Sequence, residues 1–381
     1  MILKNGNVLY NGRFSTCDIK IEGEKIAEIG LLAYNDDKML NDNRILDVSD
    51  MYVLPGFIDT HIHGAYGARF SDPNPDINII TAFEATKGVT SIAATTASSE
   101  FSDLLRQIDV IYNAAKHNTK GAKIAGIHAE GPFINKKNKG AMNEKYIIPP
   151  SVDSFKEMLD HSKGLLKIMT IAPEIENAKD IIDFAVKNNI KISIGHTSAT
   201  TDEADRAIKW GAEQSTHTFN AMRSFNHREP GVLGSVLLNP KVKCEMICDF
   251  VHIHPKTTEL IYRLKGADNI NIVSDSGHAA GMDVSEFFVD GQKRYVKNGV
   301  VRLEDGTIAG STKTMLEGVQ NLYNIGIPLE DISKMASQNP AKSLEIENET
   351  GSISVGKYAD IVILDKNLQV KYTLINGKKV V

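Results

Sequence analysis

The chain has 381 residues, a formal charge of −5, 42% hydrophobic residues and 24% charged residues. This composition is typical of a folded globular protein and not of a disordered one, and the acidic balance argues against a nucleic-acid partner. The length fits one large α/β domain with an accessory piece. We expect no signal peptide and no membrane partner, because no apolar run is long enough to cross a bilayer.

Three cysteines, Cys17, Cys244 and Cys248, form no even-numbered framework. This usage is typical of a reducing compartment. Cys244 and Cys248 fall on one face of an expected strand, where buried thiols are favoured over a soft metal site. We therefore expect a cytoplasmic protein.

Both ends of the chain are expected to form short β-strands. Alternating residues, with Asn-Gly or Glu-Gly turns typical of hairpins, occur at 2–9, 17–23, 25–30, 359–365 and 370–378. The two termini therefore predict one small β-sandwich domain, made of residues 1–52 and 345–381. It would surround a larger domain of residues 53–344.

The central part alternates short apolar runs with helical periodicity. The runs are 56–61, 90–96, 123–130, 167–173, 191–197, 214–220, 243–249 and 270–275. Helical periodicity, with several capping residues, covers 102–118, 151–163, 177–189, 201–210 and 255–265. Eight strands alternating with helices predict a (β/α)8 TIM-like barrel. A doubly wound sheet is the alternative, but no Gly-x-Gly-x-x-Gly follows a strand.

Polar residues stand at the ends of five of these runs. They are His61 and His63, Glu130, His196, His217, and Asp275. Each alone is more often a satisfied polar group at a strand end. In a barrel, however, the carboxyl ends of all strands meet at one rim. A carboxylate and two imidazoles with an open position are typical of a catalytic zinc-type site.

Such a site requires further groups for hydrolysis. A divalent metal lowers the pKa of bound water toward ~7, and Asp275 is suited to take up and return its proton. His252, just past the seventh run, is placed to polarise a carbonyl. We expect His128 to point away from Glu130, with its role open. The other histidines, mostly solvent-facing or structural, are His117, His161, His227, His254 and His278.

A loop at 220–231 follows the sixth run and contains Arg223 and Arg228. A guanidinium binds phosphate or carboxylate oxygens in a bidentate manner. The loop therefore indicates an anion pocket, although surface arginines are common.

Several motifs resemble a known family. Pro55-Gly56-Phe57-Ile58-Asp59-x-His61-x-His63-Gly64 is similar to the first strand of the amidohydrolase superfamily. More specific are 128–133, 195–197, 216–222, 228–231 and 274–275, which resemble the N-acetylglucosamine-6-phosphate deacetylases. The resemblance implies hydrolysis of N-acetyl-D-glucosamine 6-phosphate to D-glucosamine 6-phosphate and acetate, in amino-sugar metabolism.

The resemblance also implies roles for individual residues. Glu130, His196 and His217 match the principal metal ligands, with zinc expected and iron(II) as the alternative. Asp275 matches the general base and acid, and His252 the group that polarises the acetamide. The substrate contacts implied are Ala141, Asn220, Ala221, Arg228 on the phosphate, and Ile308, Ala309 and Gly310.

Two features vary within this family. His61 and His63 are read as ligands of a second ion, which only some members bind. Met142 stands where many members have histidine, and a thioether cannot donate to a sugar hydroxyl, so the hexosamine preference could differ. Family members are commonly homodimers in which the partner borders the phosphate pocket, and we expect the same here.

Two other interpretations remain open. One is a related amidohydrolase that acts on cyclic amides, N-acyl amino acids or nucleobases. The other is an inactive barrel retained for interactions, which predicts the loss of ligands or of the base. The chain retains both.

Overall fold

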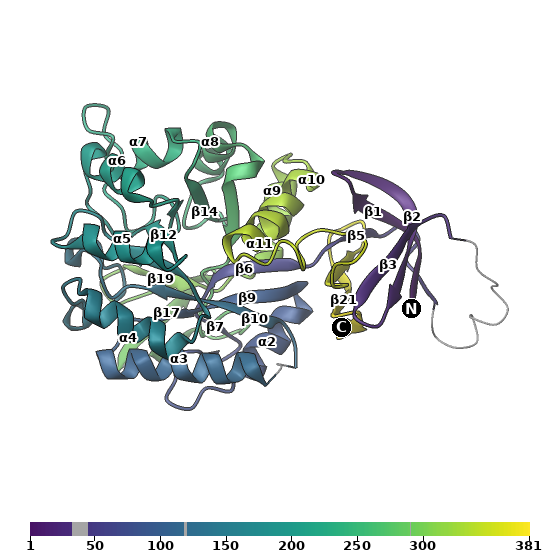
Figure 1. Ribbon diagram of the computed structural model, residues 1–381, viewed down its shortest axis with the longest axis horizontal. Helices are drawn as coiled ribbons and strands as arrows, with labels where there is room; N and C mark the ends of the chain where they lie inside the picture. Colours follow the sequence, from purple (N-terminus) through teal and green to yellow (C-terminus); the bar gives the residue numbers. More distant parts are fainter. Residues whose placement is uncertain (33–44, 118–119, 290) are drawn as a thin grey trace.

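The computed structural model describes residues 1–32, 45–117, 120–289 and 291–381. Its largest part is the predicted eight-stranded parallel barrel, whose strands follow one another in chain order (Figure 1). The last strand returns to the first, because the backbone N–H of Asp275 donates to His61 O at 2.9 Å. The strands are β6 (Phe57–Ile62), β9 (Val89–Thr96), β10 (Lys123–Glu130), β11 (Leu166–Ile171), β12 (Lys191–Ile194), β13 (Gln214–Ser215), β14 (Lys243–Ile247) and β15 (Ile270–Val273).

Helices cover the outside of the barrel (Figure 1). They are α2 (Ile77–Thr86), α3 (Phe101–Lys116), α4 (Val152–Ser162), α5 (Ala178–Lys187), α6 (Thr201–Trp210), α7 (Gly231–Leu238), α8 (Pro255–Lys265), α9 (Met315–Asn324), α10 (Leu329–Ser333) and α11 (Asn339–Ser343). Helix α6 begins as predicted because Thr200 and Glu203 form a capping box. The predicted end of the helical segment 102–118, at Asn118, lies outside the described residues.

Strands from both chain ends form one mixed sheet beside the barrel (Figure 1). Its strands are β1 (Ile2–Tyr10), β2 (Arg13–Glu22), β3 (Lys25–Gly30), β4 (Ile45–Asp47), β5 (Tyr52–Pro55), β20 (Ile361–Leu364), β21 (Val370–Ile375) and β22 (Lys378–Lys379). Strand β5 lies between β1 and β20, so it joins the two ends of the chain directly. The predicted sandwich thus takes the form of a single hydrogen-bonded sheet. The domain boundary at residue 52 stays a prediction, and it falls at the first residue of β5.

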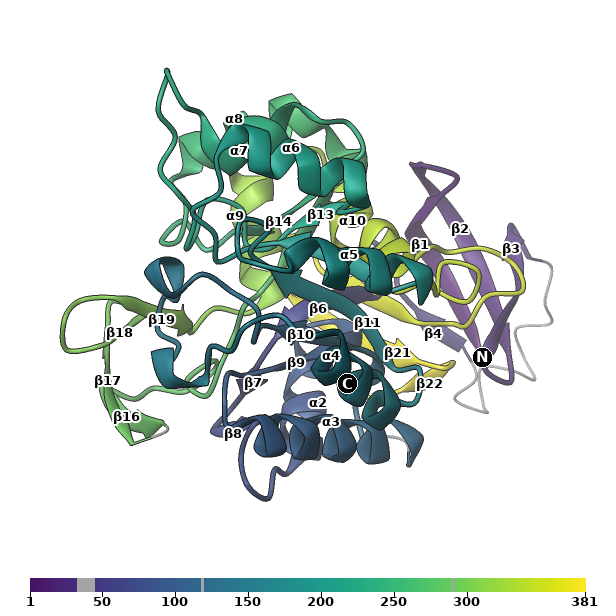
Figure 2. The same cartoon turned by 60° about the vertical axis from the view of Figure 1, so that its left-hand side comes forward.

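A small antiparallel sheet extends from the barrel after β15, on the side away from the terminal sheet (Figure 2). It consists of β16 (Glu286–Val289), β17 (Gln292–Lys297), β18 (Val300–Arg302) and β19 (Ile308–Ser311). The sequence analysis did not predict this flap. All four strands are short, and β16 and β17 are largely exposed, so they lack the continuous apolar runs that mark the barrel strands.

The end of the barrel opposite the carboxyl ends of the strands is closed by apolar side chains. Ile58, Ala93 and Ile168 pack there against Ala341 in α11 and Leu344 directly after it. The helix ring adds the main hydrophobic core around the barrel. None of the helices in the described part of the chain combines the length and apolar character that a membrane crossing requires.

One ion pair joins the barrel to the terminal sheet. Lys123 Nζ, on β10, lies 2.6 Å from Asp360 Oδ2 and donates to Asn376 Oδ1 at 3.0 Å. The Asp360 side chain is fully buried and also accepts from Thr350 Oγ1 at 2.8 Å. Removing one member of such a pair leaves the other charge without compensation.

We therefore expect Asp360→Ala to lower the free energy of unfolding by about 3 kcal/mol, measured by urea denaturation. The control is Asp183→Ala, which removes a carboxylate from the exposed pair with Lys179 on α5 and is expected to cost less than about 0.5 kcal/mol. Equal losses in the two variants would contradict a structural role for the buried pair.

Candidate active site

A cavity of about 410 Å³ opens at the carboxyl end of the barrel. Most of the predicted site residues line it: His63, Glu130, Ala141, His196, His217, Asn220, Ala221, His252, Asp275, Ile308, Ala309 and Gly310. His61 is fully buried and is not part of this lining. Arg228 is exposed on the loop before α7 and does not line the cavity either.

Three side chains from β10 and the ends of β12 and β13 converge on one point. Glu130 Oε1 lies 3.1 Å from His196 Nε2 and 3.0 Å from His217 Nε2, and the two Nε2 atoms are 3.1 Å apart. Ligand atoms around a tetrahedral ion at about 2.1 Å are separated by roughly 3.4 Å. This cluster is therefore close to the spacing that a divalent ion requires.

A second cluster adjoins the first. His61 Nε2 and His63 Nε2 lie 3.6 Å and 3.4 Å from Asp275 Oδ1. Glu130 belongs to both groups, because its Oε2 lies 3.1 Å from His63 Nε2 while its Oε1 faces the first cluster. One carboxylate therefore stands between two possible ion positions, one at His196 and His217 and the other at His61, His63 and Asp275.

The donor atoms of these clusters fit a cation. His61 Nε2 is buried and has no hydrogen-bond partner among the described residues, which is costly for a polar atom unless a ligand occupies the position. Burial opposes a charge on His63, but hydrogen bonds to Asp275 and Glu130 raise its pKa to about 9. The carboxylates thus require nearby positive charge, which imidazole protons provide in the metal-free chain and which a divalent ion can provide in their place.

The backbone at three strand ends directs side chains over the cavity. His196, His217 and Asp275 each stand two residues beyond the last residue of their strand. Their φ angles are 49°, 28° and 46°, in the region that L-residues seldom adopt. Each strand therefore ends in a sharp turn, and such uncommon backbone conformations are concentrated at functional sites.

His252 is held by a carboxylate of its own loop. Asp249 Oδ2 lies 2.7 Å from His252 Nδ1, and Asp249 Oδ1 accepts from the backbone N–H of His252 at 2.9 Å. Burial lowers the pKa of His252, but the hydrogen bond and charge of Asp249 outweigh it and raise that pKa above 6.5. His252 lines the cavity, and with Nδ1 bonded to Asp249 its Nε2 is a donor only in the imidazolium form, which the raised pKa favours.

The cavity wall beyond the ligands combines the loop after β10 with the flap. Met142 lines it beside Ala141, and its thioether accepts from Ser98 Oγ at 3.2 Å. Two arginines also line the cavity: Arg69 pairs with Asp72 at 3.0 Å, and Arg294 donates to Ala309 O at 3.2 Å. The sequence analysis did not select either of these cations.

Comparison with known proteins decides the family. An amidohydrolase family model matches residues 52–380. The N-acetylglucosamine-6-phosphate deacetylase of Lysinibacillus sphaericus is 35% identical over 99% of this chain and 97% of its own length. The chain belongs to the N-acetylglucosamine-6-phosphate deacetylase family. It is therefore a hydrolase of the amidohydrolase superfamily.

Solved structures of this deacetylase family have the same fold over the whole chain. A crystal structure from Thermotoga maritima superposes with a TM-score of 0.89 at 32% identity, covering 100% of this chain and 99% of that one. A Mycobacterium smegmatis variant in complex with N-acetyl-D-glucosamine-6-phosphate gives a TM-score of 0.92 at 30% identity, with the same coverage.

One expectation for this deacetylase-family chain was wrong. His128 does not point away from Glu130, because residues two apart on a strand share a face. Its buried ring lies inside the barrel, 4.5 Å from that of His61, with Nε2 2.8 Å from Thr170 Oγ1. His278 proves to line the cavity, stacked on Phe287.

Sequence reasoning also missed Glu245 and Asp59. Glu245 Oε2 lies 2.9 Å from His61 Nδ1, while Asp59 Oδ1 accepts from the backbone N–H groups of His61 and Ser274. A charged residue in the middle of an apolar run such as 243–249 was the available signal, since carboxylates are seldom fully buried without a partner.

Proposed function

We propose that this chain hydrolyses N-acetyl-D-glucosamine 6-phosphate to D-glucosamine 6-phosphate and acetate. The observation that carries the proposal is the convergence of Glu130, His196 and His217 with Asp275 on one cavity wall. The complex of the Mycobacterium smegmatis relative supports this choice of substrate. Hydrolysis of cyclic amides, N-acyl amino acids or nucleobases is less favoured, because two relatives that match 99% of this chain at 35% and 36% identity are N-acetylglucosamine-6-phosphate deacetylases.

Glu130, His196 and His217 would hold the essential ion, with zinc preferred and iron(II) as the alternative. His61 and His63 would hold a second ion together with Asp275. A divalent ion here supplies Lewis acidity, which acidifies water and polarises a carbonyl. The ligand set of imidazole and carboxylate suits either metal, and the first cluster is the more compact one.

In this proposal Asp275 is the general base and acid. Burial raises the pKa of Asp275, but the charge of His61 and a hydrogen bond to His63 outweigh it and lower the pKa to about 2. The carboxylate is therefore ionised at neutral pH, takes a proton from the attacking water and returns it to the leaving amine nitrogen. The imidazolium form of His252 donates its Nε2–H to the acetamide oxygen, while Asp249 accepts from Nδ1 on the opposite side of the ring.

The sugar is proposed to contact Asn220, Ala221 and Ala141, with Ile308, Ala309 and Gly310 from the flap closing over it. At this wall Met142 stands where many family members have histidine, so a thioether takes the place of a hydrogen-bond donor.

The free-thiol state of all three cysteines supports the proposed cytoplasmic location.

Arg228 is proposed to bind the phosphate group from a neighbouring subunit. Its exposure, and its position outside the cavity of its own chain, support a role across the interface of a homodimer. Charge-assisted bidentate contacts suit a guanidinium and a phosphate.

The function is tested by acetate release from N-acetyl-D-glucosamine 6-phosphate, followed with and without a chelator. We expect release by the metal-loaded protein, loss of activity after chelation, and recovery on adding Zn²⁺ or Fe²⁺. Absence of acetate from the metal-loaded protein, or full activity after verified metal removal, would contradict the proposal.

Asp275→Asn is expected to lower kcat about 10²- to 10⁴-fold, because the amide cannot accept and return a proton. Binding of one ion and of substrate is expected to remain measurable by calorimetry. The control Asp180→Asn changes an exposed carboxylate on α5 and is expected to leave kcat unchanged. Turnover within threefold of the parent would remove Asp275 from the mechanism.

Arg228→Ala is expected to raise KM for the phosphorylated sugar about 10-fold or more, which corresponds to one lost charge-assisted contact. Metal content should be unchanged. Arg263→Ala, at an exposed ion pair on α8, is the matched control and should leave KM as in the parent. An unaltered KM for Arg228→Ala would show that the phosphate is bound elsewhere.

A further inference from the structure

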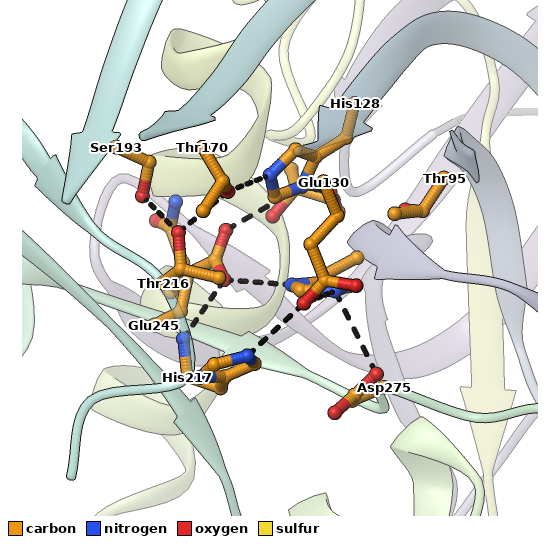
Figure 3. Close-up of polar contacts among 12 residues, drawn as sticks. Thr95, His128, Glu130, Thr170, Ser193, Thr216, His217, Glu245 and Asp275 are labelled. Atoms are coloured by element: carbon orange, nitrogen blue, oxygen red, sulfur yellow. Dashed lines mark hydrogen bonds and ion pairs between the residues drawn. The ribbon is translucent and has the colours of Figure 1, made fainter. Parts of the chain in front are cut away.

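Glu245 is a fully buried carboxylate on β14, inside the barrel and below the cavity. It lies beside His217 on the side away from Asp275 (Figure 3). Its Oε2 lies 2.9 Å from His61 Nδ1 and accepts from the backbone N–H of His217 at 3.1 Å. One oxygen thus contacts a residue of each ligand cluster.

The contact with His61 determines which of its nitrogens faces the second cluster. An ionised carboxylate only accepts hydrogen bonds, so the Nδ1 facing Glu245 carries a proton. Nε2, which lies 3.6 Å from Asp275 Oδ1 and 3.4 Å from Glu130 Oε1, is then the nitrogen whose lone pair an ion at the second cluster would use. Hydrogen bonds of this kind orient metal-binding histidines and increase their basicity.

The contact with His217 acts on the backbone instead. His217 has a φ of 28°, and the next residue, Thr218, donates its backbone N–H to the carbonyl oxygen of Glu245 at 2.9 Å. Glu245 therefore holds the turn after β13 from both its side chain and its main chain. The imidazole of His217 is not contacted, so the first cluster retains its three ligand atoms without Glu245.

Glu245 is also near His128, but this grouping does not make a further ligand set. Both nitrogens of His128 are used, by Thr60 O at 3.0 Å and Thr170 Oγ1 at 2.8 Å. Glu245 Oε1 lies 3.9 Å from His128 Nδ1, beyond hydrogen-bond distance. The geometry leaves Glu245 with a role that acts through His61.

We propose that Glu245 is the positioning residue that allows a second divalent ion to bind at His61, His63 and Asp275. This inference rests on the proposed metal-dependent function. Loss of such an outer hydrogen bond typically weakens metal binding about 10- to 100-fold. The ion at Glu130, His196 and His217 should be affected far less.

The test uses Glu245→Gln in the full chain, with Zn²⁺ titrated by calorimetry and metal per chain measured by elemental analysis. The amide would present an N–H to His61 Nδ1 or accept weakly from it. We expect second-ion affinity to fall 10- to 100-fold, with first-ion affinity within threefold of the parent.

Glu84→Gln is the matched control. Glu84 is as buried as Glu245, on α2, and burial followed by the charge of Asp59 raises its pKa to about 8. It is therefore neutral at pH 7, and the amide should leave both affinities unchanged. Loss of the second ion in this control as well would show a general packing effect and overturn the proposal.

A second variant, Glu245→Asp, keeps the proposal testable if Glu245→Gln folds poorly. Glu245→Asp retains the carboxylate with a shorter reach and should recover part of the second-ion affinity relative to Glu245→Gln. A folded Glu245 variant that binds both ions with the same affinities as the parent would overturn the proposal. A parent chain that binds one ion only would overturn it as well. Two-ion binding with this dependence but no acetate release would instead overturn the proposed function alone.

Discussion

Glu130 lies between two groups of imidazoles, with Oε1 next to His196 and His217 and Oε2 next to His63. A carboxylate inside a barrel is costly unless positive charge and hydrogen bonds compensate for it. The surrounding histidines provide that compensation, and the same atoms have the spacing of a metal site. The requirement to balance buried charge therefore also creates the candidate catalytic centre.

The layer below this centre is polar as well. His128, Thr170, Thr216 and Ser193 form a continuous hydrogen-bonded set, with Thr216 Oγ1 2.7 Å from Thr170 Oγ1 and 2.6 Å from Ser193 Oγ (Figure 3). Most barrel interiors are filled by branched aliphatic side chains. Here Glu245 restrains His61 from beneath, and the hydroxyl groups hold His128, whose ring packs against that of His61. A restrained ligand set reduces the reorganisation that binding an ion would otherwise require.

The ligand-bearing positions could be predicted because barrel topology gathers strand ends at one rim. His61, His63, Glu130, His196 and Asp275 were recognisable from their places at the ends of apolar runs. Periodicity also located the helices, since caps such as Thr200 with Glu203 mark where they begin. The flap was missed because its strands are short and the first two, β16 and β17, are exposed and have no apolar pattern. Arg228 was assigned to the phosphate by resemblance, and a single chain does not bring it to the cavity.

The sequence by itself determined the barrel, the terminal sheet and the ligand types, because these follow from local periodicity and from residue chemistry. Tertiary structure decided which nitrogen of His61 faces the second cluster and which residue holds it. That information lies in the contact between His61 and Glu245, 184 residues apart. The hydrogen-bond partners of His128 needed the structure too, as they come from β6 and β11. Contacts between distant strands leave no trace in local periodicity, so only the folded barrel shows them.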